Sequence, residues 1–335
     1  MPITTIQLSH GSGAGLRALL NEIIYPALAT DQTGPFEDAA VLSSFSGRPA
    51  FTTDAFVVDP LEFPGGDIGK LSACGTINDL AMMGARPRFL AVALILEEGL
   101  DAALLSRVLC SLRRICDDTG MRIACGDTKV VDRGKADGMF ITTTGIGEVA
   151  EGRALSAANC KEGDSVIVSG GIGLHGIAIL AARKKLSFAS EAVSDCAPLW
   201  DIADRLLRAV PGVRVLRDAT RGGVAAALNE IADDSQVTMR LTAKAIPVPG
   251  VVHGACSFLG MDPLQIANEG RFIAVVPADQ AHKALDTLRG HAPGRDAAII
   301  GTVEKRGRFP VLLTTDIGGT RVVELPPGEL LPRIC

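Results

Sequence analysis

The chain has 335 residues, of which 47% are hydrophobic and only 4% aromatic, and its formal net charge is −5. This length predicts two domains or one large one, and the apolar content predicts a sizeable core of Ala, Val, Leu and Ile. The acidic balance without a Lys/Arg run argues against a nucleic-acid partner. The longest notable apolar run, residues 89–96, is too short to span a bilayer, so no membrane partner is expected.

The eight cysteines are scattered along the chain, and none forms a C-x-x-C pair. This spacing argues against a zinc site. The N-terminus lacks the pattern of a signal peptide, so we expect a cytoplasmic location, where disulfides are rare. Most cysteines are then expected to be small buried apolar residues. Cys335 differs because it is the last residue, and chain ends are usually exposed.

The first half of the chain alternates predicted helices and strands behind a glycine-rich start at residues 9–15. Helical periodicity marks the helices, and short apolar runs bounded by turn residues mark the strands. The predicted helices span residues 16–28, 68–83 and 102–119. The predicted strands span residues 39–45, 50–58, 89–96, 121–125 and 139–149.

The second half is also mixed α/β. Its predicted helices span residues 174–183, 197–209, 222–233, 251–259 and 278–289. Its predicted strands span residues 165–169, 213–216, 237–241, 272–276 and 298–303. The last eleven residues, 325–335, carry three prolines, which exclude a helix or a central strand. We therefore expect an extended, swinging arm that ends in Cys335.

Two nucleotide-binding motifs are considered and set aside. Residues 171–176 match G-x-G-x-x-G between a predicted strand and a predicted helix. A dinucleotide site also needs an acidic residue at the end of the next strand, and residues 184–188 make a poor strand. We interpret these glycines as a tight turn. A P-loop is not indicated, because Lys70 is followed by Leu71 and Pro64 stands where the motif needs glycine.

Four aspartates, Asp38, Asp54, Asp79 and Asp127, lie at the ends of predicted elements, and Lys129 follows the last of them. Several carboxylates with one lysine are what Mg²⁺ and a triphosphate need, namely hard oxygen ligands and a cation. Taken singly, each aspartate is more often a cap or a turn residue. The prediction of a magnesium and phosphate site therefore depends on the set.

Three further places carry candidate chemistry. Residues 217–223 form a Gly-rich helix start, where Arg221 suits an anion site or is simply a solvated arginine beside an ordinary cap. Glu269 is a candidate general base, although the sequence alone favours a solvated turn residue before Gly270. His10, in the glycine-rich segment, is a candidate for contact with phosphate or with the reacting group, or belongs to a disordered arm.

Together these segments resemble the HypE family of hydrogenase maturation proteins, within the larger group of aminoimidazole ribonucleotide synthetase, selenophosphate synthetase and thiamine-phosphate kinase. The resemblance covers nearly the whole chain, and its most specific part is the terminal sequence PRIC. Ala14, where the family has glycine, is a small departure. The segments that carry the resemblance are residues 8–13, 51–54, 63–70, 78–82, 126–131, 217–223, 267–270 and 332–335.

The resemblance implies an α/β (α+β) two-lobed synthetase fold. Each lobe is expected to hold a mixed sheet with helices on one side. Two N-terminal lobes are expected to pair into a barrel across a homodimer, with ATP near the seam. The expected segments are 1–35, an N-terminal arm and helix; 36–155, an ATP-binding and dimerisation domain; 156–310, a C-terminal α/β domain; and 311–335, a C-terminal segment with a flexible tail.

The resemblance also implies a function. Members of the family receive a carbamoyl group on the terminal cysteine from the carbamoyltransferase HypF. They then use ATP to dehydrate the S-carboxamide to an S-cyanate. The cyano group passes to iron held by a HypC–HypD complex and becomes a cyanide ligand of a [NiFe]-hydrogenase.

The cofactors implied are ATP and Mg²⁺, and the resemblance assigns roles to named residues. Cys335 carries the reacting group and Glu269 is the base. Lys129 neutralises charge on the transferred phosphoryl group, with His10 in support. The expected magnesium and nucleotide ligands are Asp38, Asp54, Asp79 and Asp127, with Thr128 and Arg221 also in the nucleotide site.

Two other hypotheses remain open at this stage. One is a small-molecule ATP user, such as a selenophosphate or purine-precursor synthetase. The first cysteine, Cys74, lies well past the N-terminal glycines, which argues against the selenophosphate alternative. The other is a non-catalytic assembly protein whose tail is a docking peptide. Replacing Cys335 by Ser separates a carrier from a docking peptide.

Overall fold

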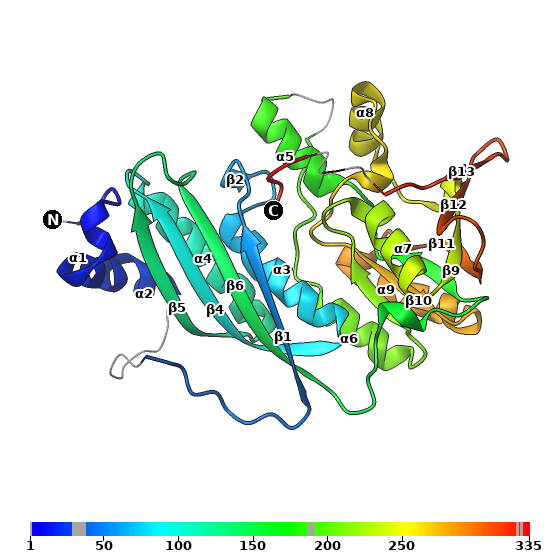
Figure 1. Cartoon of the computed structure of the whole chain (residues 1–335), viewed down its shortest axis with the longest axis horizontal. Helices are drawn as coiled ribbons and strands as arrows, with labels where there is room; N and C mark the ends of the chain where they lie inside the picture. The colour runs from blue at the N-terminus through cyan, green and yellow to red at the C-terminus, as the bar shows by residue number, and fades with distance from the viewer. Residues whose placement is uncertain (1, 29–37, 187–190, 326–327, 329–330) are drawn as a thin grey trace.

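The computed structural model describes residues 2–28, 38–186, 191–325, 328 and 331–335, and these form two lobes side by side (Figure 1). The N-terminal lobe is built on a four-stranded sheet in the order β1-β6-β4-β5. All its pairs are antiparallel except β4 with β5, which are parallel because α4 (Ala102–Thr119) crosses over between them. The strands are β1 (Arg48–Phe56), β4 (Ala85–Glu97), β5 (Arg122–Val131) and β6 (Met139–Val149).

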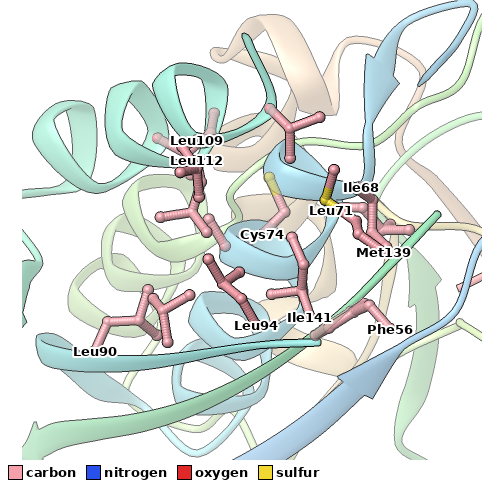
Figure 2. Close-up of a cluster of buried hydrophobic side chains, with 14 of the residues drawn as sticks. Phe56, Ile68, Leu71, Cys74, Leu90, Leu94, Leu109, Leu112, Met139 and Ile141 are labelled. Carbon is pink, nitrogen blue, oxygen red and sulfur yellow. The ribbon is translucent and has the colours of Figure 1, made fainter. Parts of the chain in front are cut away.

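One face of this sheet is covered by α4 and by α3 (Ile68–Met82) (Figure 1). The carboxylate of Asp67 caps α3 by accepting from the amides of Gly69 and Lys70. A side chain at Gly69 would collide with the carbonyl of Val108 on α4, so glycine lets the two helices touch. Between these helices and the sheet lies the core in Figure 2, formed by Phe56, Ile68, Leu71, Cys74, Leu90, Leu94, Leu109, Leu112, Met139 and Ile141.

The opposite face of the N-terminal sheet is bare of helices among the residues that the structure describes (Figure 1). Phe51, on this sheet, is 71% exposed. A groove of about 500 Å³ runs over the sheet and is lined mostly by apolar or small side chains, including Phe89, Ala91, Ala93 and Ile146. In the part of the chain that the structure describes, this largely apolar face of the sheet is therefore without cover.

The C-terminal lobe holds a seven-stranded sheet in the order β13-β12-β9-β11-β7-β10-β8. Most of its pairs are antiparallel, and β12 with β9 is parallel. Its strands are β7 (Ser165–Val168), β8 (Val215–Asp218), β9 (Val237–Thr242), β10 (Phe272–Val276), β11 (Ala298–Lys305), β12 (Val311–Thr314) and β13 (Thr320–Val322).

Helices cover both faces of this second sheet, so the expectation of helices on one side is wrong for the C-terminal lobe. Ile273 and Val275 of β10 pack toward α7 (Gly223–Asp234). Phe272, Ala274 and Val276 pack toward α6 (Trp200–Ala209) and α9 (Ala281–Arg289). The physical reason is that β10 is apolar at every position, and each of its residues is buried, which requires cover on both faces.

The remaining helices lie at the edges of the lobes. α5 (Leu174–Lys184) and α8 (Gly250–Leu259) pack against each other at the top of the view in Figure 1. The predicted N-terminal helix is present as α1 (Gly13–Leu19), the π-helical turn η2 (Leu20–Ile24) and α2 (Tyr25–Leu28). The short elements are β2 (Glu62–Phe63), β3 (Gly66–Asp67), η1 (Leu8–Gly11), η3 (Ala157–Asn159), η4 (Ala243–Ala245), η5 (Pro263–Gln265), η6 (Ala278–Gln280) and η7 (Ala292–Gly294).

Most predicted elements are confirmed, and the predicted strand at 39–45 is not. Those residues follow an extended path without a ladder partner, and Val41 is 92% exposed. Only Phe45 of this run contacts a ring, packing edge-on against Phe89. Residues 29–35 of the expected N-terminal segment lie outside the described residues. In the described ranges, every helix lacks the combination of length and apolar character that crossing a bilayer requires.

Candidate active site between the two lobes

Two of the predicted aspartates meet where the N-terminal lobe faces the C-terminal lobe. Asp54 lies near the end of β1, and Asp79 lies in the last turn of α3. Thr52 donates its hydroxyl to Asp79 Oδ2 at 2.6 Å. The pKa of Asp54 is raised to about 6 by burial, then by the charge of Asp79 and a hydrogen bond to it, while Arg221 lowers it. The carboxyl of Asp54 is therefore half protonated near pH 6.

A third carboxylate comes from the other lobe. Asp218 ends β8, and β8 packs against α3. The pKa of Asp218 is raised to about 7, mainly by burial and also by the charges of Asp79 and Asp54, while Arg217 acts to lower it. These three carboxylates therefore share one electrostatic environment across the lobe junction.

Glu269 is the fourth carboxyl group of this site. It lies in the loop before β10 and is only 3% exposed, so the solvated turn residue that the sequence alone favours is wrong. Burial raises its pKa well above the ordinary value, and interactions with Cys196, Asp218, Asp195 and Asp54 act in the same direction. Its Oε1 has no hydrogen-bond partner among the described residues. A buried carboxyl that resists ionisation suits proton transfer.

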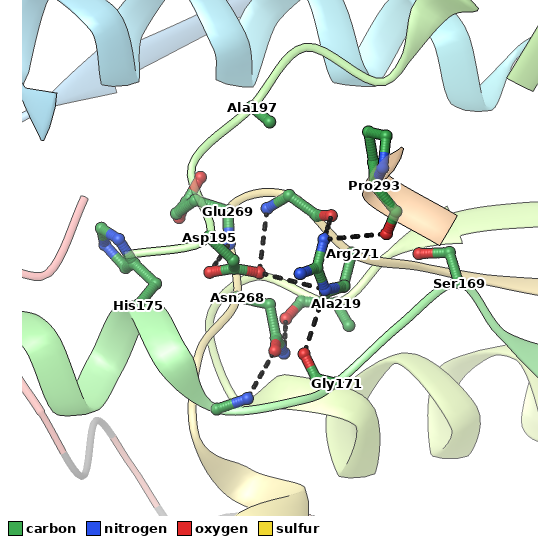
Figure 3. Close-up of polar contacts among 12 residues, drawn as sticks. Ser169, Gly171, His175, Asp195, Ala197, Ala219, Asn268, Glu269, Arg271 and Pro293 are labelled. Carbon is green, nitrogen blue, oxygen red and sulfur yellow. Dashed lines mark hydrogen bonds and ion pairs between the residues drawn. The ribbon is translucent and has the colours of Figure 1, made fainter. Parts of the chain in front are cut away.

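The backbone of Glu269 is held from both sides (Figure 3). Its amide donates to Asp195 Oδ1 at 3.3 Å. Its carbonyl accepts from the amide of Ala197 at 3.3 Å and from Asn78 Nδ2 at 3.3 Å. Gly270 must lack a side chain, because a Cβ there would collide with the carbonyl of Asp195. The loop is therefore fixed tightly against the segment that precedes α6.

The C-terminal tail is docked close to this site. The amide of Val57, just beyond β1, donates to the carbonyl of Cys335 at 3.2 Å. Ile334 is buried, and its carbonyl lies 2.6 Å from His175 Nε2. Val57 is three residues past Asp54, so the Cα atoms of these two residues lie roughly 10 Å apart along the chain. The thiol-bearing residue is partly buried and packs on the N-terminal core.

Two arginines hold the tail in place. Arg183 of α5 donates to the carbonyl of Pro332 at 2.6 Å and to that of Arg333 at 2.5 Å. Arg333 in turn donates to the carbonyl of Val57 at 3.0 Å and forms an ion pair with Asp137. The described part of the tail is neither helix nor strand, as predicted, but it is anchored at its end. Residues 326–327 and 329–330 of the expected arm lie outside the described residues.

The other predicted residues lie at the opposite edge of the N-terminal sheet. Asp127 and Lys129, on β5, form an ion pair at 3.3 Å, with side chains 65% and 67% exposed. Asp38 lines the same groove as Asp127. Thr128 is buried, and its amide donates to Asp127 Oδ1 at 2.8 Å. His10 lies in η1 beside β5, and its Nδ1 accepts from the amide of Gln7 at 3.1 Å.

The structure thus divides these residues, the predicted ones together with Asp218, into two sets named for the nearest edge of the N-terminal sheet. The β1-edge site comprises Asp54, Asp79, Asp218, Glu269 and Arg221. The β5-edge set comprises Asp38, Asp127, Thr128, Lys129 and His10. Three strand spacings separate β1 from β5, which is roughly 14 Å. One ion therefore cannot contact all four predicted aspartates within one chain.

The metal prediction can be tested against the donor chemistry. Within the described ranges, no group of three or more His, Cys, Asp or Glu side chains is arranged to hold a metal ion. Asp54 and Asp79 nevertheless fit a divalent cation in part, because both offer oxygen ligands and a cation would relieve their mutual repulsion. The pair supplies two protein ligands, and Mg²⁺ commonly takes the rest from water and phosphate.

Sequence reasoning missed several residues of the site. Asp218 lies in the segment 217–223, in which the sequence indicated only Arg221 as a candidate site residue. The position of Asp218 just after the strand predicted at residues 213–216 could have indicated it, as it did for Asp127. Asp195, His175 and Arg183 carried no signal, because their roles arise only from contacts with distant parts of the chain.

Comparison with known proteins defines the class first. Residues 36–149 match the family model for the N-terminal domain of AIR synthase related proteins. Residues 161–313 match the model for the C-terminal domain of the same proteins. The two-lobed α/β fold, with carboxylates gathered at the lobe junction, therefore belongs to the class of AIR synthase related proteins.

Relatives of known activity narrow the class. The carbamoyl dehydratase HypE of Cupriavidus necator is 48% identical over 332 residues, covering 98% of this chain and 95% of that protein. The Azotobacter vinelandii enzyme of the same name is 46% identical over 332 residues, covering 99% and 97%. A crystal structure of the maturation protein HypE in complex with ATP matches with a TM-score of 0.94 at 43% identity, covering 99% and 100%. A HypE–HypF complex matches with a TM-score of 0.81 at 43% identity, covering 94% and 100%. The chain belongs to the carbamoyl dehydratase HypE family.

Proposed function

We propose that this protein uses ATP to dehydrate an S-carboxamide on its own Cys335 to an S-cyanate, which supplies the cyanide ligand of a [NiFe]-hydrogenase. The observation that carries the proposal is the docked tail. The carbonyl of Cys335 is bound by Val57, three residues past Asp54, and Asp54 faces Glu269 across the lobe junction. The backbone of Cys335 is thus bound just beyond the end of β1, three residues past Asp54, while the other carboxylates approach from α3, β8 and the loop before β10.

The chemistry requires an activated oxygen and a base. An amide oxygen is a poor leaving group, but its phosphate ester is a good one. ATP would transfer its terminal phosphoryl group to the carboxamide oxygen, so that the C–O bond breaks with phosphate as the leaving group. The two N–H protons would leave as the C≡N bond forms. The products are the S-cyanate, ADP and phosphate.

Glu269 would take up one of the two N–H protons, and the other would leave with the phosphate. Its carboxyl is buried and its Oε1 has no partner among the described residues, so one oxygen is available for a proton. Its raised pKa makes it a stronger base than an exposed carboxylate once it is ionised. Asp54 and Asp79 would hold Mg²⁺, which neutralises phosphate charge when bound, and Arg221 would contact the phosphates.

The β5-edge set belongs to a nucleotide site that two protomers form together. The apolar, helix-free face of the N-terminal sheet would pair with a second copy, closing a barrel. Both edges of the sheet then become seams between protomers. Asp38, Asp127 and Thr128 would contact nucleotide or its Mg²⁺ there, with Lys129 on the phosphoryl group and His10 in support. The four-segment division at residues 35, 155 and 310 remains part of this proposal.

The partners follow from the carrier role. HypF, which forms a complex with a relative, would load the carbamoyl group on Cys335, and a HypC–HypD complex would accept the cyano group at iron. The tail must leave Arg183 and His175 to reach either partner. The free thiols from Cys74 to Cys256 support a reducing compartment, the cytoplasm.

The test is intact mass measured in two steps. The protein is first incubated with the partner carbamoyltransferase and carbamoyl phosphate, and then with Mg-ATP. We expect a gain of one carbamoyl group followed by the loss of one water. Cys335→Ser should abolish both changes, whereas Cys110→Ser, which removes an exposed thiol elsewhere, should leave both intact. An unchanged mass with ATP still bound would favour a docking peptide or a small-molecule ATP user.

A further inference from the structure

A short segment before α6, residues 194–197, contacts the Glu269 loop directly and the docked tail through the ring of His175. Asp195 accepts the amide of Glu269 on Oδ1 at 3.3 Å and the amide of Gly270 on Oδ2 at 3.2 Å (Figure 3). Ser194 Oγ lies 2.8 Å from His175 Nδ1, and the other nitrogen of that ring contacts the carbonyl of Ile334. The segment therefore joins the proposed base to the residue beside Cys335 by two short chains of hydrogen bonds.

We propose that Asp195 is a positioning residue for the dehydration, which fixes the Glu269 loop relative to the tail and places a negative charge beside the Glu269 carboxyl. The proposal rests on the role assigned above to Glu269. It adds a residue that acts through Glu269 rather than on the substrate.

The environment of Asp195 indicates more than a structural cap. Its side chain has no exposed surface, and the nearest cation among the described residues, Arg271 Nε, lies 3.9 Å from its Oδ2. The guanidinium of Arg271 instead donates hydrogen bonds to the carbonyls of Gly171, Gly270 and Pro293. A buried carboxylate with so loose an ion pair is costly, and a neutral side chain could bind a loop amide at lower cost. The charge itself is then the feature that the site uses.

The groups that face Glu269 come from several elements. Burial is the main cause of its raised pKa, followed by Cys196, Asp218, Asp195 and Asp54. Asp218 comes from β8 and Asp54 from β1, so they remain when Asp195 is changed. Removing the charge of Asp195 lowers the pKa of Glu269, because a like charge no longer opposes its ionisation.

The experiment compares Asp195→Asn with a matched control, Asp164→Asn. Asp164 is also buried, accepts the amide of Lys161 at 2.7 Å and pairs with Arg214 at 2.6 Å. It lies at the start of β7, whereas Glu269 lies near the other end of that strand. The readouts are the pH profile of single-turnover dehydration of the carbamoylated protein and the pKa of Glu269 by ¹³C NMR of labelled glutamate.

In Asp195→Asn we expect the Glu269 pKa and the rising limb of the pH profile both to move down by about one unit. Asp164→Asn should move neither. Asp195→Glu keeps the negative charge on a side chain that is one methylene longer. It should slow the reaction without moving the rising limb of the pH profile. Asp195→Ser is a smaller neutral variant that serves the same test should the Asn variant not fold.

Loss of activity in Asp195→Asn with an unmoved Glu269 pKa would reduce Asp195 to a structural cap and overturn the proposal. Glu269→Gln also assigns the NMR signal. Full activity in that variant would instead overturn the role of Glu269 itself, whatever Asp195→Asn does. The two failures are therefore distinguishable.

Discussion

The two edges of the N-terminal sheet carry the same residue types in opposite environments. At the β1 edge, Asp54 and Asp218 are partly buried and have pKa values raised to about 6 and about 7, mainly by burial. At the β5 edge, Asp127 and Lys129 are more than half exposed and paired with each other. Carboxylates withdrawn from water hold protons and resist ionisation, whereas exposed charges remain available to a charged ligand.

This contrast separates two tasks of an ATP-dependent dehydratase. Proton transfer needs groups whose ionisation is costly, and the β1-edge site provides them next to the docked tail. Binding of a polyanion needs accessible charge on a rigid element, and β5 offers it. The three predictions below sharpen or break this division, in order of expected effect.

The largest effect is expected at the β1 edge. Glu269→Gln should lower the rate of dehydration by about 10²–10⁴-fold, because it removes the base while keeping the side chain's size. Carbamoylation of Cys335 should be unchanged, since that step belongs to a partner enzyme. The measurement is the single-turnover loss of water by mass. A rate within about threefold of the unmodified protein would place the proton transfer elsewhere.

Asp218→Asn tests the cost of burying a carboxyl. The folded state holds the Asp218 proton up to about pH 7, whereas the ordinary value is 3.8. The raised pKa of Asp218 therefore adds its full contribution to the free energy of unfolding below about pH 4. This contribution is lost as the pH rises from about 4 to 7. The variant has no such carboxyl, so its free energy of unfolding should not fall over this range and should exceed that of the parent protein by about 1–2 kcal/mol at pH 8.

Thermal unfolding of the Asp218→Asn variant at pH 5 and pH 8 provides the measurement. Asp234→Asn replaces an exposed aspartate at the end of α7 and is the control. It should leave the unfolding temperature nearly unchanged at both pH values. A variant that is less stable than the parent at pH 8 would mean that the ionised carboxylate is compensated by a cation, against the contrast drawn above.

The smallest effect on stability is expected at the β5 edge. Lys129→Ala removes an exposed ion pair and should change the unfolding free energy by less than about 0.5 kcal/mol. Affinity for Mg-ATP should nevertheless fall several-fold, and the loss should shrink at high salt because screening weakens exposed charges. Isothermal titration at two salt concentrations measures this. An unaltered affinity would remove Lys129 from the nucleotide site.

Much of the secondary structure could be predicted from local pattern alone. Both α4 and β6 begin and end where periodicity placed them, because an amphipathic stripe and strict alternation report directly which positions are buried. The strand expected at residues 39–45 is absent, because an apolar run forms a strand only where the edge of a neighbouring strand is available to pair with it. The sequence pattern of a run contains no information about that neighbour.

The sequence by itself determined the family, the mixed α/β character, the non-helical tail and the terminal Cys335 as the residue of interest. Only the tertiary structure decided which carboxylates meet. Strand order separated Asp127 from Asp54, and packing of β8 on α3 added Asp218. Contact with residues 195–197 fixed the Glu269 loop, and contacts with His175, Arg183 and Val57 anchored the tail. The physical reason is that pKa shifts and proximity arise from charges and burial contributed by segments far apart in the chain, which local periodicity does not encode.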